Sequence, residues 1–214
     1  MSRIKKLELD EWDQELREMT AADTGTPLEQ GPMRMWAHSP EISKGLTAFG
    51  GSLKQNRSLP DRLVELVRLR VAFHNQCRSC MAIRYQDGQA AGITEDLVCS
   101  LEKPMEAENL SEAEKAAIHY GELFATNHLA INDEVYNNLR KYFNESEIVE
   151  LSITVAFFVG FGRLAATYHM VEELPDAFKA GEDETLTPWG TESILERSLI
   201  WQILQLLKLG GKNG

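Results

Sequence analysis

Helix-start signals recur along this chain, and they constrain its fold more than any other feature. Two capping boxes stand out, Ser111 with Glu114 and Asn144 with Glu147. In such a box, each side chain satisfies a free backbone N–H group of the first helical turn. Apolar residues at helical spacing follow both boxes, whereas no period-2 alternation or hairpin turn indicates a strand. The sequence therefore predicts an all-α fold.

Further start and stop signals divide the chain into helices. We expect a helix after Ser58 and Pro60, a second one capped by Asn75 and ending near Gly92, and shorter ones after Thr94 and Asn132. The helix after Asn144 is long, apolar and expected to continue through Met170.

The chain is expected to divide near residue 173. Residues 1–173 are predicted to form one helical domain with an N-terminal extension. Residues 174–214 are predicted to form a connector and a C-terminal amphipathic helix, at about Thr191 to Leu209, that packs on the domain or on a neighbouring subunit.

Charge and composition exclude several function classes. The chain has 214 residues and a formal net charge of −11, so nucleic acid is not an expected partner. No apolar signal segment is visible at the N-terminus, and the apolar run from Ile153 to Phe161 is too short to span a bilayer. The three cysteines do not make a disulfide framework, so we expect a cytoplasmic protein without membrane contact.

Cys77 and Cys80 form a C-x-x-C pair at the start of the helix predicted after Asn75. On such a helix Arg84 would share their face, one turn after Cys80. The helix N-terminus and the guanidinium would both favour the thiolate, which is the reactive form of cysteine. The spacing also permits a disulfide between a nucleophile and a resolving partner.

Two other interpretations of the pair remain open. A structural zinc site needs four ligands, but Cys99 stands alone and the five histidines form no H-x3–5-H pair. Alternatively, both thiols are inert core residues, which is a common fate of free cysteine.

Glu65 lies twelve residues before Cys77, on the preceding predicted helix. A helix that turns back would bring this carboxylate near the cysteines, and its apolar neighbours suit a carboxyl that shuttles protons. The ordinary interpretation is a solvated glutamate or an ion-pair partner of Arg68 or Arg70.

Taken together, Glu65, Cys77 and Cys80 in E-x11-C-x-x-C resemble the alkylhydroperoxidase D-like branch of the carboxymuconolactone decarboxylase superfamily. The resemblance extends over roughly Pro40 to Met170 and includes the downstream stretch from LSEAEKAAIHYG to FFVGFGRLAA. It implies an all-α AhpD-like bundle that assembles into homo-oligomers, as dimers, trimers or hexamers. It also implies thiol-dependent reduction of hydroperoxides without a cofactor or metal.

The resemblance further implies a role for each of these residues. Cys80 attacks the peroxide and becomes a sulfenic acid, Cys77 condenses with it to a disulfide, and an external thiol reductant opens that disulfide. Glu65 belongs to the proton relay that deprotonates the thiol.

One position departs from the family pattern. Where relatives carry a histidine four residues after the second cysteine, this chain has Arg84, which cannot act as a base. Arg84 could instead stabilise a thiolate or pair with Glu65, and His74 is a candidate helper near the cysteines. Two alternative functions remain open. One is a carboxymuconolactone decarboxylase-like lyase, and the other is a non-enzymatic α-helical oligomer with inert thiols.

Overall fold

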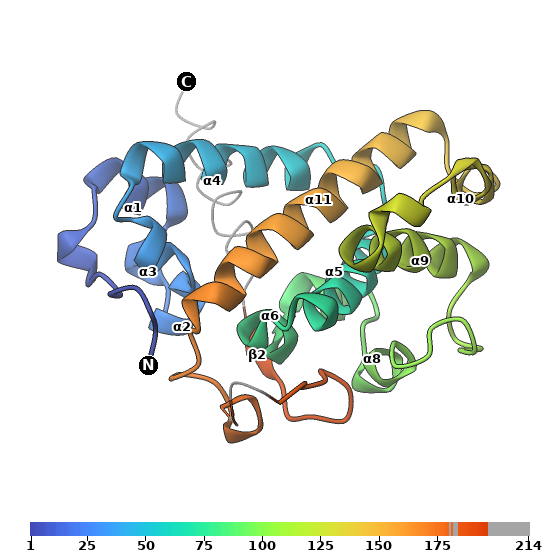
Figure 1. Cartoon of the computed structure of the whole chain (residues 1–214). Coiled ribbons are helices and arrows are strands. Elements are labelled where there is room, and N and C mark those ends of the chain that lie inside the picture. The colour runs from blue at the N-terminus through green and yellow to red at the C-terminus, as the bar shows by residue number, and fades with distance from the viewer. Residues whose placement is uncertain (180, 182–183, 197–214) are drawn as a thin grey trace. The chain divides into compact units, whose positions relative to one another are not determined.

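The computed structural model describes residues 1–179, 181 and 184–196, and these residues are mostly helical (Figure 1). They divide into two compact units, Ser2–Arg57 and Ser58–Leu195. Each unit has a hydrophobic core of its own, so each is described separately. The predicted boundary near residue 173 stays a prediction.

The unit Ser2–Arg57 is built from short helices. Its core is formed by Leu7, Trp12, Leu16, Ala22, Met33 and Ala37. Its elements are η1 (Leu9–Glu11), α1 (Gln14–Thr20), η2 (Ala22–Thr24), α2 (Pro27–Gln30), α3 (Met33–Trp36) and α4 (Pro40–Gln55).

The unit Ser58–Leu195 carries the cysteine pair. It begins with α5 (Asp61–Asn75), α6 (Arg78–Ala82), β1 (Ile83–Tyr85), α7 (Gln86–Ala90) and α8 (Glu95–Ser100). It continues with α9 (Glu112–Thr126), η3 (His128–Ala130), α10 (Asp133–Leu139), α11 (Glu145–Tyr168) and η4 (Asp176–Phe178), and β2 (Ile194–Glu196) follows.

Helix α5 packs against both α9 and α11, and these three helices supply most of the core (Figure 1). Gly121 of α9 permits the close approach, because a Cβ there would lie 3.1 Å from Val67 of α5. Leu66 and Leu69 are fully buried in the same core. Because α5 is held at the centre of this core, the position of its last turn is fixed. The cysteine segment begins directly after that turn, at Gln76.

The all-α prediction is confirmed, and so are most of the predicted helix starts. Ser111 with Glu114 and Asn144 with Glu147 form capping boxes, and Thr94 and Asn132 cap α8 and α10. Capping is a local interaction, so it can be predicted from the sequence alone.

Three expectations about secondary structure are wrong. Asn75 ends α5 instead of capping a long helix through Gly92, because Gln76 takes a left-handed conformation. Two three-residue strands, β1 and β2, pair as a small sheet that the sequence did not suggest. The expected start of the terminal helix at about Thr191 is also wrong, because residues 191–193 are irregular and Ile194–Glu196 form β2; the rest of that helix, to about Leu209, lies outside the described residues and stays a prediction.

Helix α11 extends well beyond its apolar run. Among the described residues, it alone is long and apolar enough to cross a membrane. This is weak evidence for a span, because the core helix of a soluble protein meets the same criterion. Residues such as Leu151 and Val155 bury one side of α11 in the core of its own unit.

Candidate active site

The cysteine segment starts at the end of α5. Gln76 has φ 49° and ψ 36°, and its backbone N–H closes α5 by donating to the carbonyls of Ala72 and Phe73. This left-handed residue turns the chain sharply. Cys77 then becomes the N-cap residue of α6, which has only five residues. The helix dipole available to the cysteines is therefore smaller than the sequence predicts.

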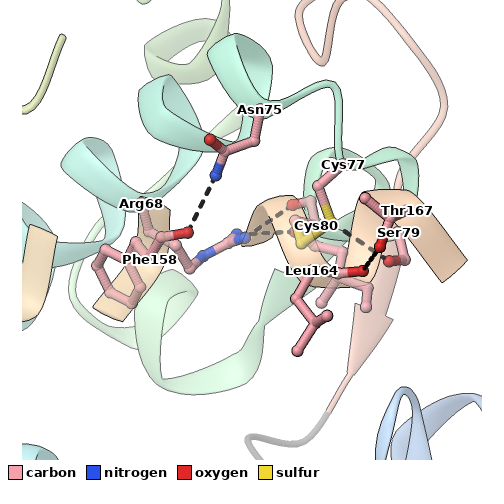
Figure 2. Close-up of a disulfide and its surroundings, with 9 residues drawn as sticks. Arg68, Asn75, Cys77, Ser79, Cys80, Phe158, Leu164 and Thr167 are labelled. Carbon is pink, nitrogen blue, oxygen red and sulfur yellow. Dashed lines mark hydrogen bonds between the residues drawn. A yellow bond between two sulfur atoms is a disulfide. The ribbon is translucent and has the colours of Figure 1, made fainter. Parts of the chain in front are cut away.

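Cys77 and Cys80 are joined by a disulfide, with their Cα atoms 5.2 Å apart (Figure 2). The two residues differ in accessibility, since Cys77 is fully buried and Cys80 is partly exposed. Figure 2 shows Leu164 and Thr167 of α11 beside the pair. A reagent from solvent would therefore meet Cys80 first.

Glu65 is buried on α5 and forms a bidentate ion pair with Arg68. The Nε and Nη2 atoms of Arg68 lie 2.7 and 2.6 Å from the two carboxylate oxygens. Gly88 of α7 packs directly on this side chain, because a Cβ at Gly88 would lie 3.0 Å from Cγ of Glu65. The ordinary interpretation, a Glu65–Arg68 pair, is therefore the observed one.

Arg68 also reaches the cysteine segment. It donates to the carbonyl oxygens of Cys80 at 2.7 Å and of Ile83 at 3.0 Å, and its guanidinium lies beside Cys80 in Figure 2. Burial disfavours the charge, but Glu65 outweighs burial and holds the pKa of Arg68 above its ordinary value. Arg68 thus connects Glu65 to the backbone of Cys80.

Arg84 does not share a helix face with the cysteines, because α6 ends at Ala82 and residue 84 lies in β1. Its side chain is buried and donates to the carboxylate of Glu95 and to the carbonyls of Met81 and Pro188. Burial lowers the pKa of Arg84, and Glu95 offsets only part of that effect. Arg84 is thus bonded to Glu95 and not to Glu65 as one expectation had it.

His74 is bonded to Glu122 of α9, with Nε2 at 3.1 Å from the carboxylate. Arg70 donates to the same carboxylate at 2.6 Å. The hydrogen bond from His74 is the largest cause that lowers the pKa of Glu122 to about 2. His74 therefore belongs to a hydrogen-bonded cluster with Arg70 and Glu122, and this geometry gives it no direct link to the disulfide.

Sequence reasoning missed two features of the site. The first is the role of Arg68, which was predicted only as a possible ion-pair partner of Glu65, although the i, i+3 spacing of the two residues was visible. The second feature is a set of hydrogen bonds that join residues around the pair to five described residues much later in the chain. These contacts join Arg78 to Phe178 and Gly181, Gln76 to Leu186, Arg84 to Pro188, and Ser193 to Glu95.

Arg163 lies on α11. Its side chain donates to the carbonyl of Ala125 at the end of α9. Glu150, also on α11, accepts bonds from Ser58 and from the backbone of Leu59. Arg163 thus connects α11 to α9.

A metal centre finds no support in the part of the chain that the structure describes. No group of three or more His, Cys, Asp or Glu side chains gathers there in a way that could hold an ion. The disulfide also engages both sulfur atoms that a zinc ion would need as thiolates.

Comparison with known proteins gives this geometry a family context. Residues 40–123 match the model of the carboxymuconolactone decarboxylase family, and this range includes Glu65, Cys77 and Cys80. Over residues 40–123, the chain is similar to that family. A similar solved structure, with a TM-score of 0.68, is described as an alkylhydroperoxidase AhpD core, an uncharacterised peroxidase-related protein from Ralstonia eutropha JMP134.

The structural similarity covers 83% of this chain and 94% of the Ralstonia chain, at 18% sequence identity. At that identity it establishes the shared fold alone. The chain is also 30% identical to an uncharacterised Mycobacterium tuberculosis protein over 128 residues, 58% of this chain and 44% of that protein. It is 28% identical to the uncharacterised Bacillus subtilis protein YdfG over 92 residues, 42% of this chain and 63% of YdfG. The chain thus spans less than two thirds of the length of either relative.

Proposed function

We propose that this protein is a thiol-dependent, peroxidase-like oxidoreductase that reduces hydroperoxides with Cys80 and Cys77. The observation that carries the proposal is the disulfide between a partly exposed Cys80 and a fully buried Cys77. In such a pair, the accessible sulfur meets the substrate and the buried sulfur resolves the intermediate.

The first step is attack by the Cys80 thiolate on a peroxide oxygen. The S–O bond forms as the O–O bond breaks, and the departing oxygen takes a proton and leaves as an alcohol or as water. Cys80 is then a sulfenic acid. Cys77 attacks its sulfur, so that the S–S bond forms and the S–O bond breaks, and the oxygen leaves as water after protonation.

The second half of the cycle needs an external thiol reductant, which we expect to be a dithiol. Its thiolate attacks the exposed sulfur of Cys80 and releases Cys77, and its second thiol resolves the mixed disulfide. Two electrons and two protons pass from the reductant to the pair. The steric reason for attack at Cys80 is the complete burial of Cys77.

Glu65 is proposed to accept the proton of the Cys80 thiol. Arg68 donates both to the carboxylate of Glu65 and to the backbone carbonyl of Cys80, and so connects Glu65 to the Cys80 residue. Arg84 has no part in this step, because its side chain is bonded to Glu95. The relay therefore lacks the histidine that the family resemblance implies.

Steady-state consumption of an alkyl hydroperoxide with dithiothreitol tests the proposal. Cys80→Ser is expected to reduce the rate by about a hundredfold or more, because it removes the nucleophile. Cys99→Ser is the matched control, since Cys99 is a free cysteine on α8. If Cys80→Ser and Cys99→Ser have the same rate as the natural protein, the proposed mechanism is wrong.

A second candidate function is that of a decarboxylase-like lyase, which the family match over residues 40–123 favours. This carbon–carbon bond cleavage needs no redox cysteine. Activity on a carboxylated lactone that survives replacement of both Cys77 and Cys80 would favour the lyase over the peroxidase.

Assembly into homo-oligomers is proposed on the resemblance alone. Light scattering coupled to size-exclusion chromatography measures it directly. A mass of one chain at micromolar concentration would refute it.

A further inference from the structure

One buried guanidinium organises the cysteine segment. Arg68 donates to four acceptors at once, namely both carboxylate oxygens of Glu65 and the carbonyl oxygens of Cys80 and Ile83. Its carbon Cζ also lies 5.0 Å from the centre of the Tyr85 ring in β1. Arg68 is only 9% exposed, so these bonds are protected from water.

The planar fork of arginine explains why this residue type suits the position. Its five N–H groups have fixed directions, so one side chain can hold a carboxylate and two separate carbonyls in one array. Lysine carries the same charge on a single nitrogen and cannot reproduce that geometry. One carbonyl belongs to Cys80, the third of the five residues of α6, and the other to Ile83, the first residue of β1; we refer to this segment, Cys80–Ile83, as the Cys80 turn.

We propose that Arg68 is a positioning residue of the redox pair, which holds the Cys80 turn in the conformation that brings its sulfur to Cys77. This inference rests on the proposed function, because it concerns how the pair opens and closes. In the reduced protein the two thiols then stay close together, and their high effective concentration favours the disulfide. This role depends on the fixed directions of the guanidinium N–H groups and not on the positive charge alone.

The neighbouring helix positions offer a matched control. Arg70 lies on the same helix, is also 9% exposed, and likewise binds a carboxylate and a carbonyl, those of Glu122 and Leu101. Its partners belong to α9 and the end of α8, away from the Cys80 turn. Replacement of Arg70 therefore reproduces the loss of a buried arginine without touching that turn.

The experiment measures the equilibrium between the Cys77–Cys80 disulfide and the dithiol in the full chain, in buffers of reduced and oxidised dithiothreitol. Arg68→Gln and Arg68→Lys are both expected to make the disulfide about tenfold easier to reduce, a rise of about 30 mV in reduction potential. Arg70→Gln is expected to leave the potential unchanged. Circular dichroism and thermal melting test whether each variant is folded. If Arg68→Gln does not fold, the reduction potential of Arg68→Lys tests the inference.

Three results would overturn the inference. An unchanged potential in Arg68→Lys would mean that charge alone suffices, and a disulfide that becomes harder to reduce would mean that Arg68 stabilises the thiolate instead. An equal shift of the reduction potential in Arg70→Gln would mean that the loss of any buried arginine on α5 has this effect through general destabilisation. Because this measurement needs no peroxide, its failure is distinguishable from a failure of the proposed peroxidase activity.

Discussion

The guanidinium of Arg84 is bound to the carboxylate of Glu95, with Nε 3.0 Å from one oxygen and Nη2 3.2 Å from the other. Arg84 stands where the family resemblance implies a histidine, and Glu95 is its ion-pair partner. Arg84 also satisfies the carbonyls of Met81 and Pro188. It therefore stabilises the strand after α6 instead of supplying a base to the cysteines.

Arg84→His is accordingly expected to lower stability without improving catalysis. A histidine is too short to reach Glu95 and both carbonyls together, so buried acceptors lose their donors. We expect a loss of about 2–3 kcal/mol in the free energy of unfolding, measured by guanidinium denaturation. A folded variant that consumes peroxide faster than the natural protein would contradict this account, because position 84 would then face the thiols.

Close packing at the end of α5 gives a second prediction. A Cβ at Gly162 of α11 would collide with Nδ2 of Asn75, which donates to the carbonyl of Phe158. Gly162→Ala must displace this buried amide, and we expect a cost of about 1–2 kcal/mol in the free energy of unfolding.

Gly160, two residues earlier in α11, is the control for that prediction. Nothing lies within 4 Å of the position that its Cβ would take. Gly160→Ala is therefore expected to be neutral or to stabilise the protein by up to about 1 kcal/mol, because alanine favours helix more than glycine does. Equal effects of the two substitutions in urea denaturation would show that Asn75 does not limit the approach of α11.

The lowered pKa of Glu122 predicts that part of the free energy of unfolding is lost in acid. Its pKa falls from an ordinary value of 4.5 to about 2, because His74 and Arg70 donate to the carboxylate. A depressed folded-state pKa stabilises the protein above pH 4.5, and that stabilisation is lost as the pH falls toward 2. The contribution is of the order of 2 kcal/mol.

Urea denaturation at several values from about pH 5 down to about pH 2.5 measures this loss. Glu122→Gln cannot titrate, so the difference in stability between it and the natural protein should narrow as the pH falls through this window. Parallel pH profiles for the two proteins would show that the His74–Glu122–Arg70 cluster contributes nothing to acid sensitivity.

The sequence predicted those features of the fold that depend on local interactions. Ser111 with Glu114 and Asn144 with Glu147 are three residues apart, so their capping boxes follow from the sequence. The break between α5 and α6 was missed because Gln76 occupies a left-handed position in which glycine or asparagine would be the usual signal.

The candidate site was predictable in composition and less so in geometry. The C-x-x-C spacing and Glu65 were visible in the sequence. In the structure, the sulfur atoms of Cys77 and Cys80 are joined. The partners of Arg84 were not visible, because Pro188 is 104 residues away and Glu95 lies on α8, beyond the predicted end of the cysteine helix. Such contacts depend on the tertiary fold, which local patterns do not encode.

The central claim is that Cys80 attacks the peroxide and Cys77 resolves the product. Reduced protein is mixed with one equivalent of an alkyl hydroperoxide, and peptide mass spectrometry then locates the oxidation. We predict a Cys77–Cys80 disulfide in the natural protein, one added oxygen atom on Cys80 in Cys77→Ser, and an unmodified Cys77 in Cys80→Ser. Oxidation of Cys77 in Cys80→Ser at the rate of the natural protein would contradict the account.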